Sequence, residues 1–194
     1  MLNPYSQGWQ NTGASGLSSN GRPSIFGALP FTSPGALPTF FSFRFTSFNP
    51  SVLNCIIIGP QSRPYFRIVT DAPIPGVSVF QNSNGQNMAL VQWHRHPEVE
   101  VRNIITRQRT SAMLALWTDQ SSRTMSVNGA TFTFTPRDNF IWIYSTASQP
   151  EILGRISRDQ DTITLELTGE AIHLGLLEPA VVATFLLQCG RNID

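Results

Sequence analysis

Lysine is missing from this chain of 194 residues: all 13 basic side chains are arginine. The absence excludes Schiff-base chemistry on a lysine amine. Two explanations for it stay open. One is selection for the planar, bidentate contacts that a guanidinium makes with anions, and the other is a compositional bias of the source lineage.

Charge is also scarce, because only 13% of the residues are charged and the formal net charge is +1. A balance this even does not fit general nucleic-acid binding, which needs a strongly basic surface. The charges are nevertheless unevenly spread. Residues 1–70 contain no acid at all, and their basic residues are Arg22, Arg44, Arg63 and Arg67.

Cysteine is rare, with Cys55 and Cys189 lying among apolar neighbours in segments typical of element interiors. This setting favours two buried free thiols. A disulfide between them would need an oxidising compartment. The glycine patterns of P-loop and dinucleotide-binding proteins are absent as well, so no cofactor is expected.

Long apolar runs are lacking too. No stretch reaches the roughly 20 apolar residues that a membrane-spanning helix requires, and Met1–Gln10 lacks the apolar core of a secretory signal. We therefore expect a cytoplasmic or nuclear protein without a transmembrane segment, although it can still be peripheral to a membrane.

The chain divides by composition into three parts. Residues 1–36 are rich in Gly, Ser, Asn and Pro and show no periodicity, which predicts a disordered tail. Residues 37–62 contain an alternating run over Phe40–Phe48 and a continuous apolar run over Val52–Ile58. These runs predict strands that pack on the domain or, through residues 40–58, on another subunit, because an uncovered apolar strand is an aggregation template.

Residues 63–194 form the main domain in this interpretation. Short alternating strands fill the range 63–168, and the Asn-Gly pairs at 84–85 and 128–129 predict tight hairpins. Residues 111–117 fit a short helix or a strand. The segment 178–189 is apolar on every side at helical spacing, so it predicts a helix that is buried all round. The predicted fold is mostly β, a curled antiparallel barrel or sandwich with a buried hydrophobic C-terminal helix.

Several stretches together resemble a domain family that is widespread in mushroom-forming fungi and has no established activity. They are 65–71 (YFRIVTD), 89–93, 99–102, 122–125, 154–156 and 181–191 (VVATFLLQCGR), with further likeness at 3–5, 45–50 and 59–63. That family is similar, more distantly, to the tubby C-terminal-like superfamily, which includes tubby proteins, plant LURP-one-like proteins and phospholipid scramblases.

The resemblance implies a β-barrel around a central hydrophobic C-terminal helix. For some members it also implies association with phosphoinositides or other membrane lipids. Tubby-like lipid binding uses a lysine–arginine pair on a surface strand. A chain without lysine has no counterpart of that pair, so no binding residue is carried over.

Four arginines within fifteen residues form a candidate anion site: Arg95, Arg102, Arg107 and Arg109. Guanidinium groups are suited to phosphate and lipid headgroups. The alternative is a solvated surface in which Glu98, Glu100 and other neighbours pair with these arginines and contribute little.

His94 and His96 form a candidate metal site, because alternate residues of a strand point to the same face. Glu98 and Glu100 are the nearest acids, and Pro97 interrupts the run. A metal needs three or four ligands, so a polar strand end is the competing interpretation. A third polar cluster consists of Asp119, Ser121, Ser122 and Arg123, but no histidine lies near them in the sequence to act as a base.

The sequence favours a non-enzymatic intracellular domain for binding or scaffolding, with a protein or an anionic phospholipid as partner and no specific nucleic acid. Two alternatives stay open. One is a peripheral phospholipid or phosphoinositide binder that uses Arg102, Arg107 and Arg109. The other is an enzyme with a pocket at the mouth of the barrel.

Overall fold

The computed structural model describes residues 39–70 and 76–194. The predicted tail, residues 1–36, lies outside the described residues. The described chain is dominated by strands, and two short helices, a 3-10 turn at Pro60–Ser62 and one longer helix complete it.

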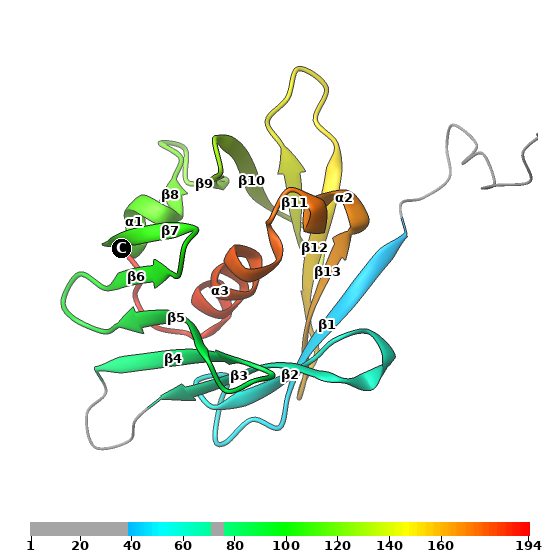
Figure 1. Ribbon diagram of the computed structural model, residues 1–194. Helices are drawn as coiled ribbons and strands as arrows, with labels where there is room; N and C mark the ends of the chain where they lie inside the picture. Colours follow the sequence, from blue (N-terminus) through cyan, green and yellow to red (C-terminus); the bar gives the residue numbers. More distant parts are fainter. Residues whose placement is uncertain (1–38, 71–75) are drawn as a thin grey trace, which may run out of the picture. The chain divides into compact units, whose positions relative to one another are not determined.

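The strands form one antiparallel sheet of 13 strands that curls strongly without closing (Figure 1). Their order across the sheet is β7-β6-β5-β4-β3-β2-β1-β13-β12-β11-β10-β9-β8. The bounds are β1 Phe40–Thr46, β2 Cys55–Ile58, β3 Pro64–Thr70, β4 Val77–Asn82, β5 Asn87–Gln92, β6 Glu98–Val101, β7 Ile105–Arg109, β8 Ala115–Leu116, β9 Arg123–Val127, β10 Ala130–Arg137, β11 Phe140–Ser145, β12 Ile152–Arg158 and β13 Ile163–Thr168. The predicted curled, mostly β fold is confirmed.

The longer helix, α3 (Leu177–Gln188), lies in the hollow of the curled sheet (Figure 1). Every residue from Pro179 to Leu186 is buried, as a helix that is apolar on all sides requires. Phe185 packs edge-on against Phe80 of β4 with ring centroids 5.0 Å apart. The prediction of a buried C-terminal helix is therefore confirmed, and Gly190 follows its end with a positive φ of 71°.

Both predicted hairpins are present. Asn128 and Gly129 join β9 to β10 with φ values of 51° and 81°, the pair of left-handed residues that a type I′ turn needs. Gly85 lies at φ 75° in the longer turn between β4 and β5. There the side-chain oxygen of Asn82 accepts the backbone N–H groups of Asn84 and Gln86, both at 3.0 Å.

Two regions differ in detail from the sequence interpretation. Residues 111–117, ambiguous between helix and strand, contribute to both, since helix α1 (Thr110–Met113) is followed directly by β8. Between β13 and α3 the chain forms a further helix, α2 (Gly169–His173), which the sequence analysis did not predict. The Thr168 hydroxyl caps α2 by accepting the N–H of Ala171 at 3.1 Å.

The apolar segment 40–58 is built into the sheet of its own chain. Strand β1 pairs with β13 on one side and with β2 on the other. Phe43 and Phe45 of β1 point into the core with 2% and 0% of their surface exposed. Strand β1 thereby joins the first half of the sheet to the last within one chain, and pairing of this segment with another subunit stays a prediction.

Candidate functional site

The four sequence-predicted arginines lie around the last two strands at one end of the sheet, but they do not converge on one point. Arg107 is on β7, and Arg109 ends that strand opposite Glu98 of β6. Arg102 follows β6 at the far end of that strand, whereas Arg95 lies in the loop before β6. All four side chains are exposed, and their role in anion binding stays a prediction.

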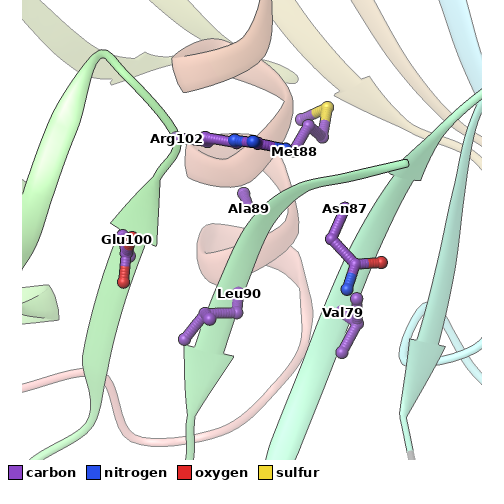
Figure 2. Close-up of a pocket in the computed structure, with 7 residues that line it drawn as sticks. All are labelled: Val79, Asn87, Met88, Ala89, Leu90, Glu100 and Arg102. Atoms are coloured by element: carbon purple, nitrogen blue, oxygen red, sulfur yellow. The ribbon is translucent and has the colours of Figure 1, made fainter.

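Neighbouring carboxylates reduce the positive charge of this group. Arg107 Nε donates to Glu98 Oε2 at 2.7 Å, and its Nη2 donates to the side-chain oxygen of Gln92. Arg102 and Glu100 both line a hollow of about 260 Å³ over β4–β6, and Val79 and Leu90 line it as well. Figure 2 shows Arg102 and Glu100 at different heights of this hollow. The mixed charge gives it no strong preference for anions.

The two histidines do not lie on a strand. His94 and His96 occupy an exposed bend between β5 and β6, so alternation along a strand does not direct them to one face. Within residues 39–70 and 76–194, no group of three or more His, Cys, Asp or Glu side chains is arranged to hold a metal ion.

The Asp119–Ser121 cluster is a surface turn. Asp119 Oδ1 accepts the backbone N–H of Ser121 at 3.0 Å and the Ser121 hydroxyl at 2.8 Å. These hydrogen bonds lower the pKa of Asp119, because they stabilise the charged carboxylate. A carboxylate with a lowered pKa is a weaker base, so this turn is poorly suited to activating the serine as a nucleophile.

The structure brings together a different set of arginines. Arg44 of β1 lies opposite Ile58 of β2, and Ile56 of β2 lies opposite Arg67 of β3. Cross-strand partners share one face of a sheet, so these four side chains lie together on the outer surface. We call this surface, formed by Arg44, Ile56, Ile58 and Arg67, the arginine face.

The strands that form the arginine face come from a long stretch of sequence that contains almost no acidic residue. Between Thr39 and Pro97 the sequence contains a single acid, Asp71, which lies outside the described residues. Strands β1 to β5 therefore carry no carboxylate. Arg44 and Arg67 are both exposed, and no described carboxylate forms an ion pair with either of them.

The nearest acid on the β13 side is already engaged. Glu166 Oε2 accepts a hydrogen bond from Arg155 Nε at 2.5 Å. The Arg155 guanidinium is also stacked among three aromatic rings, 5.3 Å from the centroid of Phe40, 4.8 Å from Phe140 and 5.6 Å from Trp142. Cation–π contacts of this kind hold a guanidinium in place. Glu166 is thus neutralised by Arg155 and does not balance the charge of Arg44.

Two hollows flank Arg67. The larger, about 500 Å³, is lined in part by the polar residues Ser47, Asn49 and Asn54. The smaller, about 260 Å³, is lined by residues that include Ile56, Tyr65 and Gln81.

The sequence contained one signal for the arginine face, the acid-free run at its start. The strand order that places Arg44 near Arg67 could not be predicted from that run.

Neither of the two thiols is activated. Burial raises the pKa of Cys55 to about 12, because a low-dielectric interior disfavours the thiolate. Burial is also the main cause that raises the pKa of Cys189. The two cysteines therefore behave as structural thiols at neutral pH.

Comparisons with known proteins add little to this geometry. No protein-family model and no curated protein matches the chain. One solved structure, an X-ray structure of a protein from Arabidopsis thaliana, is similar with a TM-score of 0.41 and 12% sequence identity, over 77% of this chain and 92% of that one. A likeness this distant carries no argument about function. Among the described residues, no helix is both long and apolar enough to cross a membrane.

Proposed function

We propose that this protein is a non-enzymatic binding domain that docks an anionic partner on the arginine face. The observation that carries the proposal is the run of five neighbouring strands, β1 to β5, whose described residues contain exposed Arg44 and Arg67 and no carboxylate. An arginine without an acidic neighbour retains its full attraction for an external anion.

The chemistry of the face fits phosphate or carboxylate groups. Each guanidinium offers a planar fork of donors that matches two oxygens of such a group. Ile56 and Ile58 lie between the two arginines, and apolar neighbours lower the local dielectric and strengthen the electrostatic attraction. By strand spacing, Arg44 and Arg67 are separated by about 12 Å at their Cα atoms, which suits a surface with several charges better than one small ion.

A phospholipid surface is a second candidate for the partner. The supporting observation is the exposure of Ile56, which leaves 37% of its surface in solvent beside Arg67. Apolar side chains next to basic ones favour peripheral attachment to anionic bilayers. The sequence resemblance to a superfamily with lipid-associated members agrees with this candidate, although neither arginine was carried over from it.

Vesicle flotation tests both forms of the proposal. The full chain is floated with phosphatidylcholine vesicles, with and without phosphatidylserine, at low and raised salt. NMR titration with tripolyphosphate reports binding of a soluble anion. We expect the double substitution Arg44→Gln and Arg67→Gln to reduce anion-dependent binding about five- to thirtyfold, since each exposed charge contact contributes about 0.5–1 kcal/mol.

The matched control is Arg107→Gln with Arg109→Gln, which removes the same charge from the far end of the sheet. Salt-sensitive vesicle binding supports the lipid candidate. Binding of tripolyphosphate without vesicle binding supports a soluble or protein-borne anion. Equal binding by the wild type and the Arg44–Arg67 variant would refute the arginine face as the site.

A further inference from the structure

Strand β7 is an edge of the sheet. It pairs with β6 on one side, and no described strand pairs with its other side. Thr106 and Arg107, in the middle of the strand, are exposed. A free edge of this kind presents a row of unpaired N–H and C=O groups to which another extended chain can add.

The other edge of the sheet is a poorer acceptor. Strand β8 has only two residues, too few to hold an added strand by backbone hydrogen bonds. Strand β7 has five residues, close to the usual length of a strand in globular proteins. Of the two edge strands, we therefore expect only β7 to accept an added strand.

A second copy of this chain is disfavoured at the β7 edge by charge. Pairing β7 with another β7 would bring Arg107 and Arg109 near the same two arginines of the partner. Like charges in cross-strand positions destabilise a sheet. The arginines thus protect the edge against self-association while leaving it open to a strand of opposite charge.

We propose that β7 binds an extended acidic segment of a partner protein by β-strand addition. Backbone hydrogen bonds to β7 supply affinity that does not depend on sequence, and alternate side chains of the added strand supply specificity. Side chains on the outer face of the added strand lie beside the outer face of β7, within about 5.5 Å at the Cβ atoms. Acidic residues at these positions reach Arg107 and Arg109.

The ion pair with Glu98 is compatible with such a partner. Arg107 uses Nε and Nη2 for Glu98 and Gln92, and a guanidinium has five N–H donors in all. The Nη1 group has no described partner and remains for an added carboxylate. Arg109, opposite Glu98 in the β6–β7 register, is exposed and forms no described ion pair.

This proposal concerns a surface separate from the arginine face. In the sheet order, β7 is separated from β3, which carries Arg67, by the three strands β4, β5 and β6. The two surfaces can therefore be tested by exchanging their variants. Failure of vesicle or tripolyphosphate binding would leave β-strand addition at β7 untouched, and the reverse also holds.

The probe is a synthetic peptide of alternating Glu and Val with blocked ends, titrated into the full chain. Fluorescence anisotropy measures its affinity, and amide hydrogen exchange followed by NMR locates its site. We expect slowed exchange at amides of residues 105–109 and about fivefold weaker binding by the Arg107→Gln, Arg109→Gln variant. The Arg44→Gln, Arg67→Gln variant is the matched control and should bind the peptide like the wild type.

Two further peptides separate backbone from charge effects. A Glu–Val peptide that is N-methylated at every residue cannot donate ladder hydrogen bonds and should lose binding, while an alternating Lys–Val peptide should be repelled. Equal binding by the N-methylated peptide, or protection located outside β7, would overturn the proposal. So would protection of residues 105–109 that rises with protein concentration in the absence of peptide, because it would identify a second copy as the occupant.

Discussion

Arg123 and Asp194 form a bidentate ion pair that ties the C-terminal residues to strand β9. Arg123 Nη1 donates to Asp194 Oδ1 at 2.9 Å, and Nη2 donates to Oδ2 at 2.7 Å. Nη1 also donates to the backbone oxygen of Leu114 at 2.9 Å. One guanidinium therefore connects β9, the α1–β8 segment and Asp194. The preceding residue, Ile193, is buried. These contacts lie where the two edges of the unclosed sheet are joined through α1.

The first prediction concerns the pH dependence of this ion pair. The hydrogen bond with Arg123 is the largest cause that lowers the pKa of Asp194 below its usual 3.8. A lowered carboxylate pKa means that the pair stabilises the fold fully above about pH 4 and loses this contribution as the pH falls through the folded-state pKa. Because the Asp194 side chain is 48% exposed, we expect the contribution to stay below about 1 kcal/mol.

Urea unfolding of the Asp194→Asn variant measures this contribution. The variant should be less stable than the wild type at pH 7, and the difference should vanish near pH 2. Asp138→Asn is the matched control and should change stability little. Asp138 Oδ2 lies 3.9 Å from Arg137 Nε, and both side chains are largely exposed. A difference that persists undiminished at pH 2 would show that the ion pair is not its source.

The second prediction concerns the buried face of α3. Leu186 is 2% exposed, so Leu186→Ala should lower the free energy of unfolding by about 2–5 kcal/mol through lost burial and a residual cavity. Leu186→Asp should prevent folding, since it places an unpaired charge in the core. Leu174→Ala is the control, because Leu174 is 40% exposed. Chemical unfolding that gives similar losses for Leu186→Ala and Leu174→Ala would contradict the buried position of the helix.

The third prediction concerns the close approach of two strands at Gly154. A Cβ atom at this position would lie 2.4 Å from the backbone oxygen of Glu166. The strands β12 and β13 would have to separate to admit it. We therefore expect Gly154→Ala to destabilise the protein by more than about 2 kcal/mol, the scale of overpacking in a well-packed region. Thermal unfolding, monitored by circular dichroism, provides the measurement.

Gly85→Ala gives the comparison for Gly154. Space is open around Gly85, but its φ of 75° disfavours a residue with a Cβ atom. The cost should be about 1 kcal/mol, arising from backbone conformation alone. If Gly154→Ala proves milder than Gly85→Ala, the β12–β13 spacing described above is incorrect.

The fourth prediction concerns the two thiols. With a pKa of about 12, Cys55 is almost entirely protonated at pH 8, and its side chain is buried. Iodoacetamide reacts with thiolates, so Cys189, which is half-buried, should be modified first. Intact mass spectrometry should show at most one added group in the folded protein and two after unfolding in guanidinium chloride. Modification of Cys55 at the rate of Cys189 would show that the β2 region opens readily.

Some residues of the candidate sites can be found from the local sequence, whereas others are brought together only by the tertiary structure. The arginines at 95–109 were found from the sequence because they lie close together along the chain. The hydrogen bonds of Arg107 with Glu98 and Gln92 depend on the β5–β6–β7 register, which pairs residues across strands. The arginine face was missed because Arg44 and Arg67 become neighbours only through β2, even though the acid-free run containing them was visible.

The sequence by itself determined the features that depend on local order. Alternation of side chains set the strands, Asn128-Gly129 set a type I′ turn, and the all-round apolar surface of residues 178–189 set a buried helix. These follow from backbone geometry and from the cost of exposing apolar side chains to water. Only the tertiary structure decided that β1 lies between β2 and β13, that β7 is left as a free edge, and that Arg123 meets Asp194. Such pairings join residues far apart in the chain, and their choice depends on how the whole sheet curls around α3 rather than on any short stretch of sequence.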